Sequence, residues 1–196
     1  SAAIVEINSE TDFVARNEDF QNTVKEVAKL TLSEKVTTDQ LKRSILPTTK
    51  RSVGDELTHL IGTIGENISL RRSDIINQNE GIVASYMHGE KIPGLGKIGV
   101  LVGIKSQGEK SELIKFGRQI AMHIAASNPQ AISPESLPKD LIQREKEVLT
   151  EQAKSSGKPE NIIEKMVEGR IRKFYEEVAL LHQTWVIDGE TKVWKV

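Results

Sequence analysis

The sequence has no cysteine, which excludes disulfides, thiolate nucleophiles and cysteine-ligated zinc. It has no apolar run near the roughly 20 residues that a membrane span needs. It also has no excess of positive charge, because 27 Lys and Arg face 28 Asp and Glu. Nucleic-acid binding depends on clustered basic residues. We therefore expect neither direct nucleic-acid contact nor membrane insertion.

Aromatic side chains are scarce, at 4% of the chain, so each one is considered singly. The remaining composition, 37% hydrophobic and 28% charged, is typical of a globular protein. A length of 196 residues suits one domain of ordinary size, or one domain with an appendage.

The usual motifs of catalytic sites are missing or out of context. The segment 94–99, GLGKIG, matches the spacing of a dinucleotide loop, but a strand pattern follows it where a helix is required. It is therefore interpreted as a loop between two strands. The four histidines form no H-x-x-x-H pair, and there is no G-x-S-x-G elbow. We expect no enzyme, no metal site and no cofactor.

Periodicity predicts a mixture of strands and helices. Alternating and β-branched residues predict four strands, at Ala3–Asn8, Asn67–Arg72, Ile82–His88 and Ile98–Ser106. Apolar residues three and four positions apart predict helices at 20–30, around Leu41 and Ile45, at 53–64 and at 111–127. The order of strand, polar loop and helix occurs twice, from residue 3 and from residue 98. The fold class is therefore α+β, with two related layers.

The pattern changes at Pro138. Apolar residues there recur at three-, four- and seven-residue spacing within a highly charged sequence. Residues 155–161, SSGKPEN, interrupt this pattern with a glycine suited to a helix end and a proline suited to a helix start. We expect an antiparallel helical hairpin, followed by a return to a sheet at Thr184–Ile187.

The segment Ser9–Phe20, SETDFVARNEDF, puts two carboxylates and Phe13 in a polar turn. Taken alone, Phe13 either folds back into the core or is presented to another molecule, and the core is the commoner fate. Glu10 and Asp12 are either helix caps or an acid/base pair. The residues alone leave these alternatives open.

Four separated segments resemble the elongation factor Ts family of exchange factors for elongation factor Tu. They are VEINSETDFVARNEDF, TIGENISLRR, IAMHIAASNP and SGKPENIIEKMVEGRIRKF, at 5–20, 63–72, 120–129 and 156–174. The resemblance implies two related subdomains, each an antiparallel sheet with helices, and a coiled-coil hairpin inserted in the second. It divides the chain into 1–97, 98–137, the hairpin at 138–182 and a returning segment at 183–196. The family's N-terminal helical module and C-terminal end are expected to be missing.

The resemblance also implies a function. In that family the TDF segment enters the nucleotide-binding domain of Tu beside the magnesium site and promotes GDP release. The contacts with Tu then fall on Thr11, Asp12, Phe13 and Val14. A fifth contact, His123, lies off the apolar stripe of its helix and is expected to face the partner.

Two alternatives stay open at this stage. One is a dimerising module that has lost exchange activity through truncation. The other is a hydrolase that uses Glu10 and Asp12. A homodimer and a two-plus-two complex with Tu are both compatible with the sequence. So are the bacterial cytoplasm and the matrix or stroma of a bacterial-type organelle.

Overall fold

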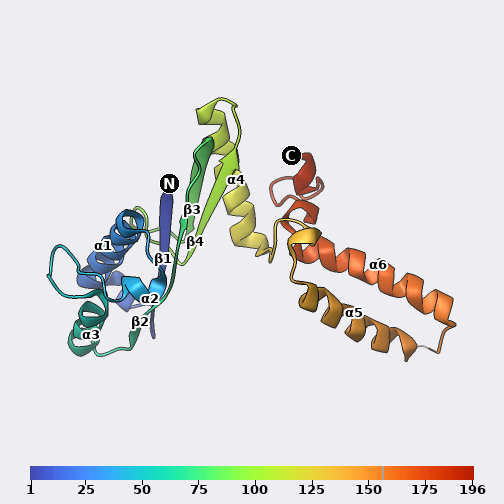
Figure 1. The fold of residues 1–196 in the computed structure, drawn as a ribbon, viewed down its shortest axis with the longest axis horizontal. Helices are drawn as coiled ribbons and strands as arrows, with labels where there is room; N and C mark the ends of the chain where they lie inside the picture. Colours follow the sequence, from blue (N-terminus) through green and yellow to red (C-terminus); the bar gives the residue numbers. More distant parts are fainter. Residues whose placement is uncertain (156) are drawn as a thin grey trace. The chain divides into compact units, whose positions relative to one another are not determined.

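The computed structural model describes residues 1–155 and 157–196. In these residues six α-helices accompany two antiparallel sheets of two strands each (Figure 1), which confirms the α+β class. The chain forms two compact units, Ser1–Met122 and His123–Val196, which are described separately below. The boundaries of the predicted subdomains stay predictions.

The first sheet joins β1 (Ala2–Ser9) to β2 (Ile68–Ile76), with Ser9 opposite Ile68 at the end of the ladder. A bulge shifts the register after Glu6, which pairs with Arg72, whereas Ile7 pairs with Leu70. Arg71 is the extra residue. Both arginines donate to the Glu6 carboxylate, at 2.7 and 2.6 Å, so one carboxylate holds both residues of the bulge.

Two helices pack against this sheet, α1 (Glu18–Glu34) and α3 (Val53–Ile64). Each begins at a residue whose side chain accepts a backbone N–H: Asn17 caps α1 and Ser52 caps α3. Their apolar faces enclose a core with Ile68 and Leu70 of β2. The members of that core from α1 and α3 are Phe20, Val27, Leu30, Val53, Leu57 and Leu60.

The helix predicted around Leu41 and Ile45 is shorter than expected. It is the single turn α2 (Thr38–Leu41), opened by a capping box of Thr37 and Gln40. The next amides, of Arg43 and Ser44, bond three residues back, which tightens and ends the helix. Ile45 instead pairs with Ser52 in an isolated bridge.

The second sheet joins β3 (Gly81–His88) to β4 (Ile98–Lys105). The segment GLGKIG runs from the connection between these strands into β4, whose first two residues are Ile98 and Gly99, so the glycine-rich part is confirmed as a loop between two strands. The helix α4 (Lys110–Ser127) packs on the sheet at Gly117. A Cβ at Gly117 would lie 2.6 Å from the Ala84 Cβ, so glycine permits this close approach.

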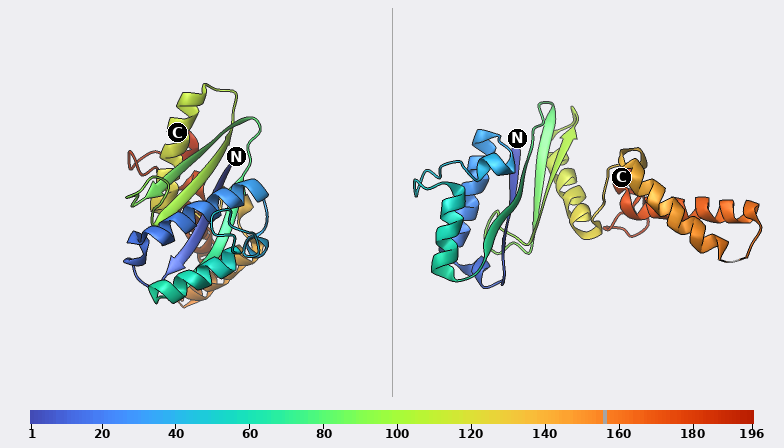
Figure 2. Two further views of the ribbon diagram at one scale, coloured as in Figure 1. Left: turned by 90° about the vertical axis from the view of Figure 1, so that its left-hand side faces the viewer. Right: turned by 60° about the horizontal axis from the view of Figure 1, so that its bottom comes forward.

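In the second unit, α5 (Lys139–Lys154) and α6 (Glu160–Val178) run antiparallel, as the right-hand view of Figure 2 shows in orange. Leu149 and Ala153 of α5 are buried, as is Ile171 of α6. The Arg170 guanidinium donates to Gln152 across the pair at 2.9 Å. The two helices predicted here are present and in contact, and the coiled-coil hairpin stays a prediction. Ser156, in the predicted connection, lies outside the described residues.

The predicted return to a sheet at Thr184–Ile187 is wrong. Thr184 and Lys192 form only an isolated bridge, and the Trp185 amide donates to the Thr191 carbonyl at 2.7 Å. The Gly189 amide donates back to the Trp185 carbonyl, so the chain reverses in a tight loop. None of the helices in the described part of the chain is long and apolar enough to cross a membrane.

Candidate partner-binding loop

The residues between β1 and α1, 10–17, are called the TDF loop. Its second half is a 3-10 turn, Val14–Arg16, in which the Arg16 amide donates to the Phe13 carbonyl at 2.9 Å. The Asn17 amide donates to the Val14 carbonyl at the same distance. The Asn17 side chain then caps α1 by accepting from the Phe20 amide at 3.0 Å. The loop is therefore joined to α1 by an unbroken series of hydrogen bonds.

Neighbouring residues of this loop have opposite environments. Val14 is 3% exposed and belongs to the core of the first unit, whereas Phe13 is 69% exposed. The interpretation of Phe13 as a core residue is therefore wrong. The core encloses the Val14 side chain, and the predicted contact of this residue with Tu stays a prediction. Because Val14 is buried, the backbone turn is held in place and the neighbouring Phe13 side chain faces solvent.

Arg16 lies close to both exposed members of the TDF sequence. Its guanidinium is 4.0 Å from the Asp12 carboxylate and 5.7 Å from the centre of the Phe13 ring. Both charged side chains are more than 60% exposed, so the ion pair contributes little to stability. Asp12 and Phe13 therefore project from one side of the turn, with a cation beside them.

The first half of the loop is held by Glu66, which the sequence reasoning did not single out. The Thr11 amide and hydroxyl donate to its two carboxylate oxygens at 2.8 and 2.6 Å. The Ser9 hydroxyl donates to the Thr11 carbonyl at 3.0 Å. Every polar group of Thr11 is therefore engaged. Glu66 belongs to TIGENISLRR, but only the strand register identifies its partner.

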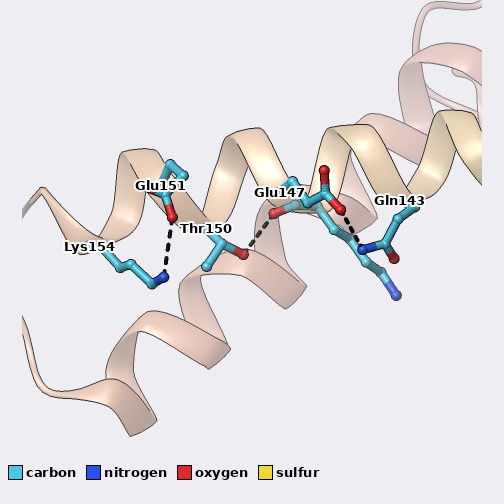
Figure 3. Close-up of a pocket in the computed structure, with 6 residues that line it drawn as sticks. Gln143, Glu147, Thr150, Glu151 and Lys154 are labelled. Atoms are coloured by element: carbon cyan, nitrogen blue, oxygen red, sulfur yellow. Dashed lines mark hydrogen bonds and ion pairs between the residues drawn. The ribbon is translucent and has the colours of Figure 1, made fainter.

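The hydrolase alternative finds no support in the surroundings of Glu10 and Asp12. Both residues lie on the surface, and neither lines either of the two best-defined surface depressions in the described chain. One of these depressions lies along α5 alone, where Figure 3 shows Gln143 bonded to Glu147 and Lys154 bonded to Glu151. The Thr150 hydroxyl there donates to the Lys146 backbone carbonyl. Across residues 1–155 and 157–196, no three His, Asp or Glu side chains are grouped to hold a metal ion.

His123 does not face outward as predicted: it is fully buried in the second unit. Nδ1 accepts from the Val186 amide at 3.2 Å, so Nε2 carries the proton and donates to Gln183 Oε1 at 2.9 Å. Trp185 stacks on the imidazole with ring centres 5.1 Å apart. The helix-face argument was wrong because it did not include the segment from residue 183 that covers this face. No observation tests a contact of His123 with Tu.

The chain resembles known proteins along its whole length. Residues 10–196 match the family described as Elongation factor TS. Elongation factor Ts of Parvibaculum lavamentivorans is 55% identical over 195 residues, which cover 100% of this chain and 63% of the relative. The same factor of Rhodospirillum centenum is 52% identical over 196 residues, and that of Gluconobacter oxydans 54% over 195. In both cases the match covers 100% of this chain and 64% of the relative. The chain thus spans slightly less than two thirds of the curated relatives it matches.

Proposed function

The chain belongs to the elongation factor Ts family, and from that premise we propose that it binds elongation factor Tu and promotes release of GDP during translation elongation. The observation that carries the proposal is the exposed Phe13 on a hydrogen-bonded loop, in the segment where the family resemblance places the intruding residues. We place this activity in the bacterial cytoplasm, because the compared relatives are bacterial.

In the proposed mechanism Phe13 acts as a wedge beside the magnesium site of Tu. Magnesium requires near-ideal octahedral geometry, so a small displacement of its ligands weakens the binding of the nucleotide phosphates. Phe13 is suited to this role because no core contact is lost when it leaves water. Asp12 brings a carboxylate to the same place, where its charge competes for the cation or its ligands.

Thermodynamic reciprocity constrains the proposal. If the chain weakens GDP binding to Tu by some factor, GDP must weaken binding of the chain by the same factor. A chain that binds GDP-loaded and nucleotide-free Tu equally well cannot shift the equilibrium. The affinity for these two forms of Tu is therefore a direct test of the mechanism.

The dimerising-module alternative has less support. The relatives are named as elongation factors, and none of those compared is described as a dimerisation module. The homodimer and the two-plus-two complex with Tu therefore stay hypotheses about assembly only.

The decisive experiment measures GDP release from Tu with a fluorescent GDP analogue, with and without the full chain. We expect faster release with the chain, and a reduction of about tenfold when Phe13 is replaced by alanine, which corresponds to roughly 1.4 kcal/mol of barrier. Binding to nucleotide-free Tu should fall less, because most of an interface lies outside a single wedge.

Trp194→Ala is the matched control. Trp194 is also an exposed aromatic, at 60%, and Lys195 lies 5.2 Å from its ring centre, as Arg16 lies near Phe13. Its removal should leave GDP release unchanged. Equal losses in the two variants would assign the effect to general surface hydrophobicity and not to a wedge.

A further inference from the structure

We propose that Glu66 is a positioning residue for nucleotide exchange. Its carboxylate clamps Thr11 and thereby holds Asp12 and Phe13 exposed for contact with Tu, which we call the presenting conformation. The proposal rests on the function proposed above, which it deepens. It requires no contact between Glu66 and Tu.

The clamp has two points of attachment on one residue. The Thr11 backbone N–H and side-chain hydroxyl bond separate oxygens of Glu66, at 2.8 and 2.6 Å, across 55 positions of sequence. Hydrogen bonds to an ionised acceptor are stronger than neutral ones, and two parallel bonds also fix orientation. Thr11 directly precedes Asp12, so its orientation determines where the Asp12–Phe13 pair begins.

The clamp continues the first sheet beyond its last paired residues. Ser9 ends β1 opposite Ile68, which begins β2. Thr11 is two positions after Ser9 and Glu66 is two before Ile68, so both lie one repeat further along the ladder. Beyond the last pair of the ladder, the Thr11 amide is thus accepted by the Glu66 side chain.

The end of α3 places Glu66 at this point. Gly65 ends the helix in the left-handed conformation, with φ +83°, and its amide bonds the Ile61 carbonyl. Glycine adopts this conformation without steric cost, and the next residue then leaves the helix axis. The turn that ends α3 therefore places the Glu66 carboxylate beside Thr11.

The clamp matters because Phe13 has no buried contact of its own to hold it. Only Val14 anchors the loop in the core, and it lies on the C-terminal side of Phe13. Without Glu66, residues 10–12 lose their fixed attachment on the N-terminal side. If 10 to 30% of molecules then keep the presenting conformation, the apparent affinity and efficiency fall roughly three- to tenfold.

The test compares Glu66→Ala with Glu26→Ala in the full chain. Glu26 is a matched control, because its carboxylate also accepts a loop amide, that of Thr48 at 2.8 Å, in the same unit. We expect Glu66→Ala to lower the exchange efficiency, measured at subsaturating chain concentrations, three- to tenfold, and Glu26→Ala to leave it within a factor of 1.5. Glu66→Gln should restore most of the loss, because Gln can accept the Thr11 amide and donate to its hydroxyl.

Amide hydrogen exchange of the free chain gives a second readout that needs no Tu. The Thr11 amide should exchange at least several-fold faster in Glu66→Ala than in Glu26→Ala, with the same midpoint of unfolding. Thr11→Val removes only the hydroxyl bond and should produce a smaller loss of GDP release. That loss should vanish when Glu66 is already alanine, because the two residues act as one unit.

The outcomes separate the clamp from the proposed function. If the wild-type chain does not accelerate GDP release, the proposed function is wrong. The hydrogen-exchange rate of the Thr11 amide then still tests the clamp. If the wild type is active and Glu66→Ala matches Glu26→Ala in exchange efficiency, the positioning role is overturned. Unchanged protection of the Thr11 amide in Glu66→Ala would overturn it as well.

Discussion

The TDF loop and the surroundings of His123 are both held by several hydrogen bonds, yet one presents an aromatic ring to solvent and the other encloses one. Phe13 is 69% exposed, whereas Trp185 is 4% exposed against His123. In the TDF loop, hydrogen bonds are accepted by backbone carbonyls and by the Glu66 carboxylate, and none of them involves the Phe13 side chain. In the second unit, Gln183 joins His123 to the carbonyls of Ser127 and Glu177, at 3.2 and 2.7 Å.

The comparison indicates that Phe13 is exposed because the backbone around it is held in a defined conformation. An aromatic side chain left in water by a loose loop would find apolar contacts at little cost. Here the buried Val14, the 3-10 turn and the Glu66 clamp hold the backbone on both sides of the exposed Phe13. The His123 region uses the same kind of bonds to close a core.

The largest expected effect is in the buried region. Trp185→Ala should lower the free energy of unfolding of the second unit by about 3–5 kcal/mol, since it removes a buried ring and leaves a cavity beside His123. Denaturant titration followed by hydrogen exchange and mass spectrometry measures the loss in residues 123–196. A loss below 1 kcal/mol would show that Trp185 is not part of a packed core.

The next effect contrasts the two neighbours in the TDF loop. Val14→Ala should cost about 2 kcal/mol of unfolding free energy from lost apolar burial, whereas Phe13→Ala should stay within 0.5 kcal/mol. Denaturant titration monitored by hydrogen exchange of the first unit provides the comparison. A larger loss for Phe13→Ala than for Val14→Ala would contradict the exposure seen in the structure.

The smallest expected effect is on the pH dependence of stability, through Glu6. The hydrogen bond from Arg71, followed by that from Arg72, holds the pKa of Glu6 below its ordinary value of 4.5 despite partial burial. A lowered pKa in the folded state means that Glu6 stabilises the fold above the unfolded pKa, and that this contribution is lost as pH falls through the folded pKa. Glu6→Gln should therefore cost a few tenths to about 1 kcal/mol at pH 7 and less at pH 3.

Urea titrations at the two pH values measure this difference. Lys105 and Glu80 form an exposed pair in the same unit, so Glu80→Gln serves as the control. A constant difference between wild type and Glu6→Gln across pH 3 to 7 would show that the bulge does not depend on the Glu6 charge.

Much of the local structure could be predicted from the sequence because its signals are short-range. The four strands and the long helices were predicted by alternation and by apolar spacing, and their ends agree with cap residues such as Asn17 and Gly65. The helix around Leu41 and Ile45 was shorter than predicted, and the segment from Thr184 was not a strand. Its apolar residues are typical of a strand, but the turn at Gly189 leaves room for only one bridge.

The sequence by itself determined the kind of elements, the family and the segment that carries the candidate site. Only the tertiary structure decided which side chains of that segment are available. Whether Phe13 or Val14 enters the core depends on one turn of backbone, and the Thr11–Glu66 bonds depend on the register of two strands 55 positions apart. Burial of His123 likewise depends on a segment 60 residues away. Periodicity describes one element at a time, whereas exposure is a property of everything that packs against it.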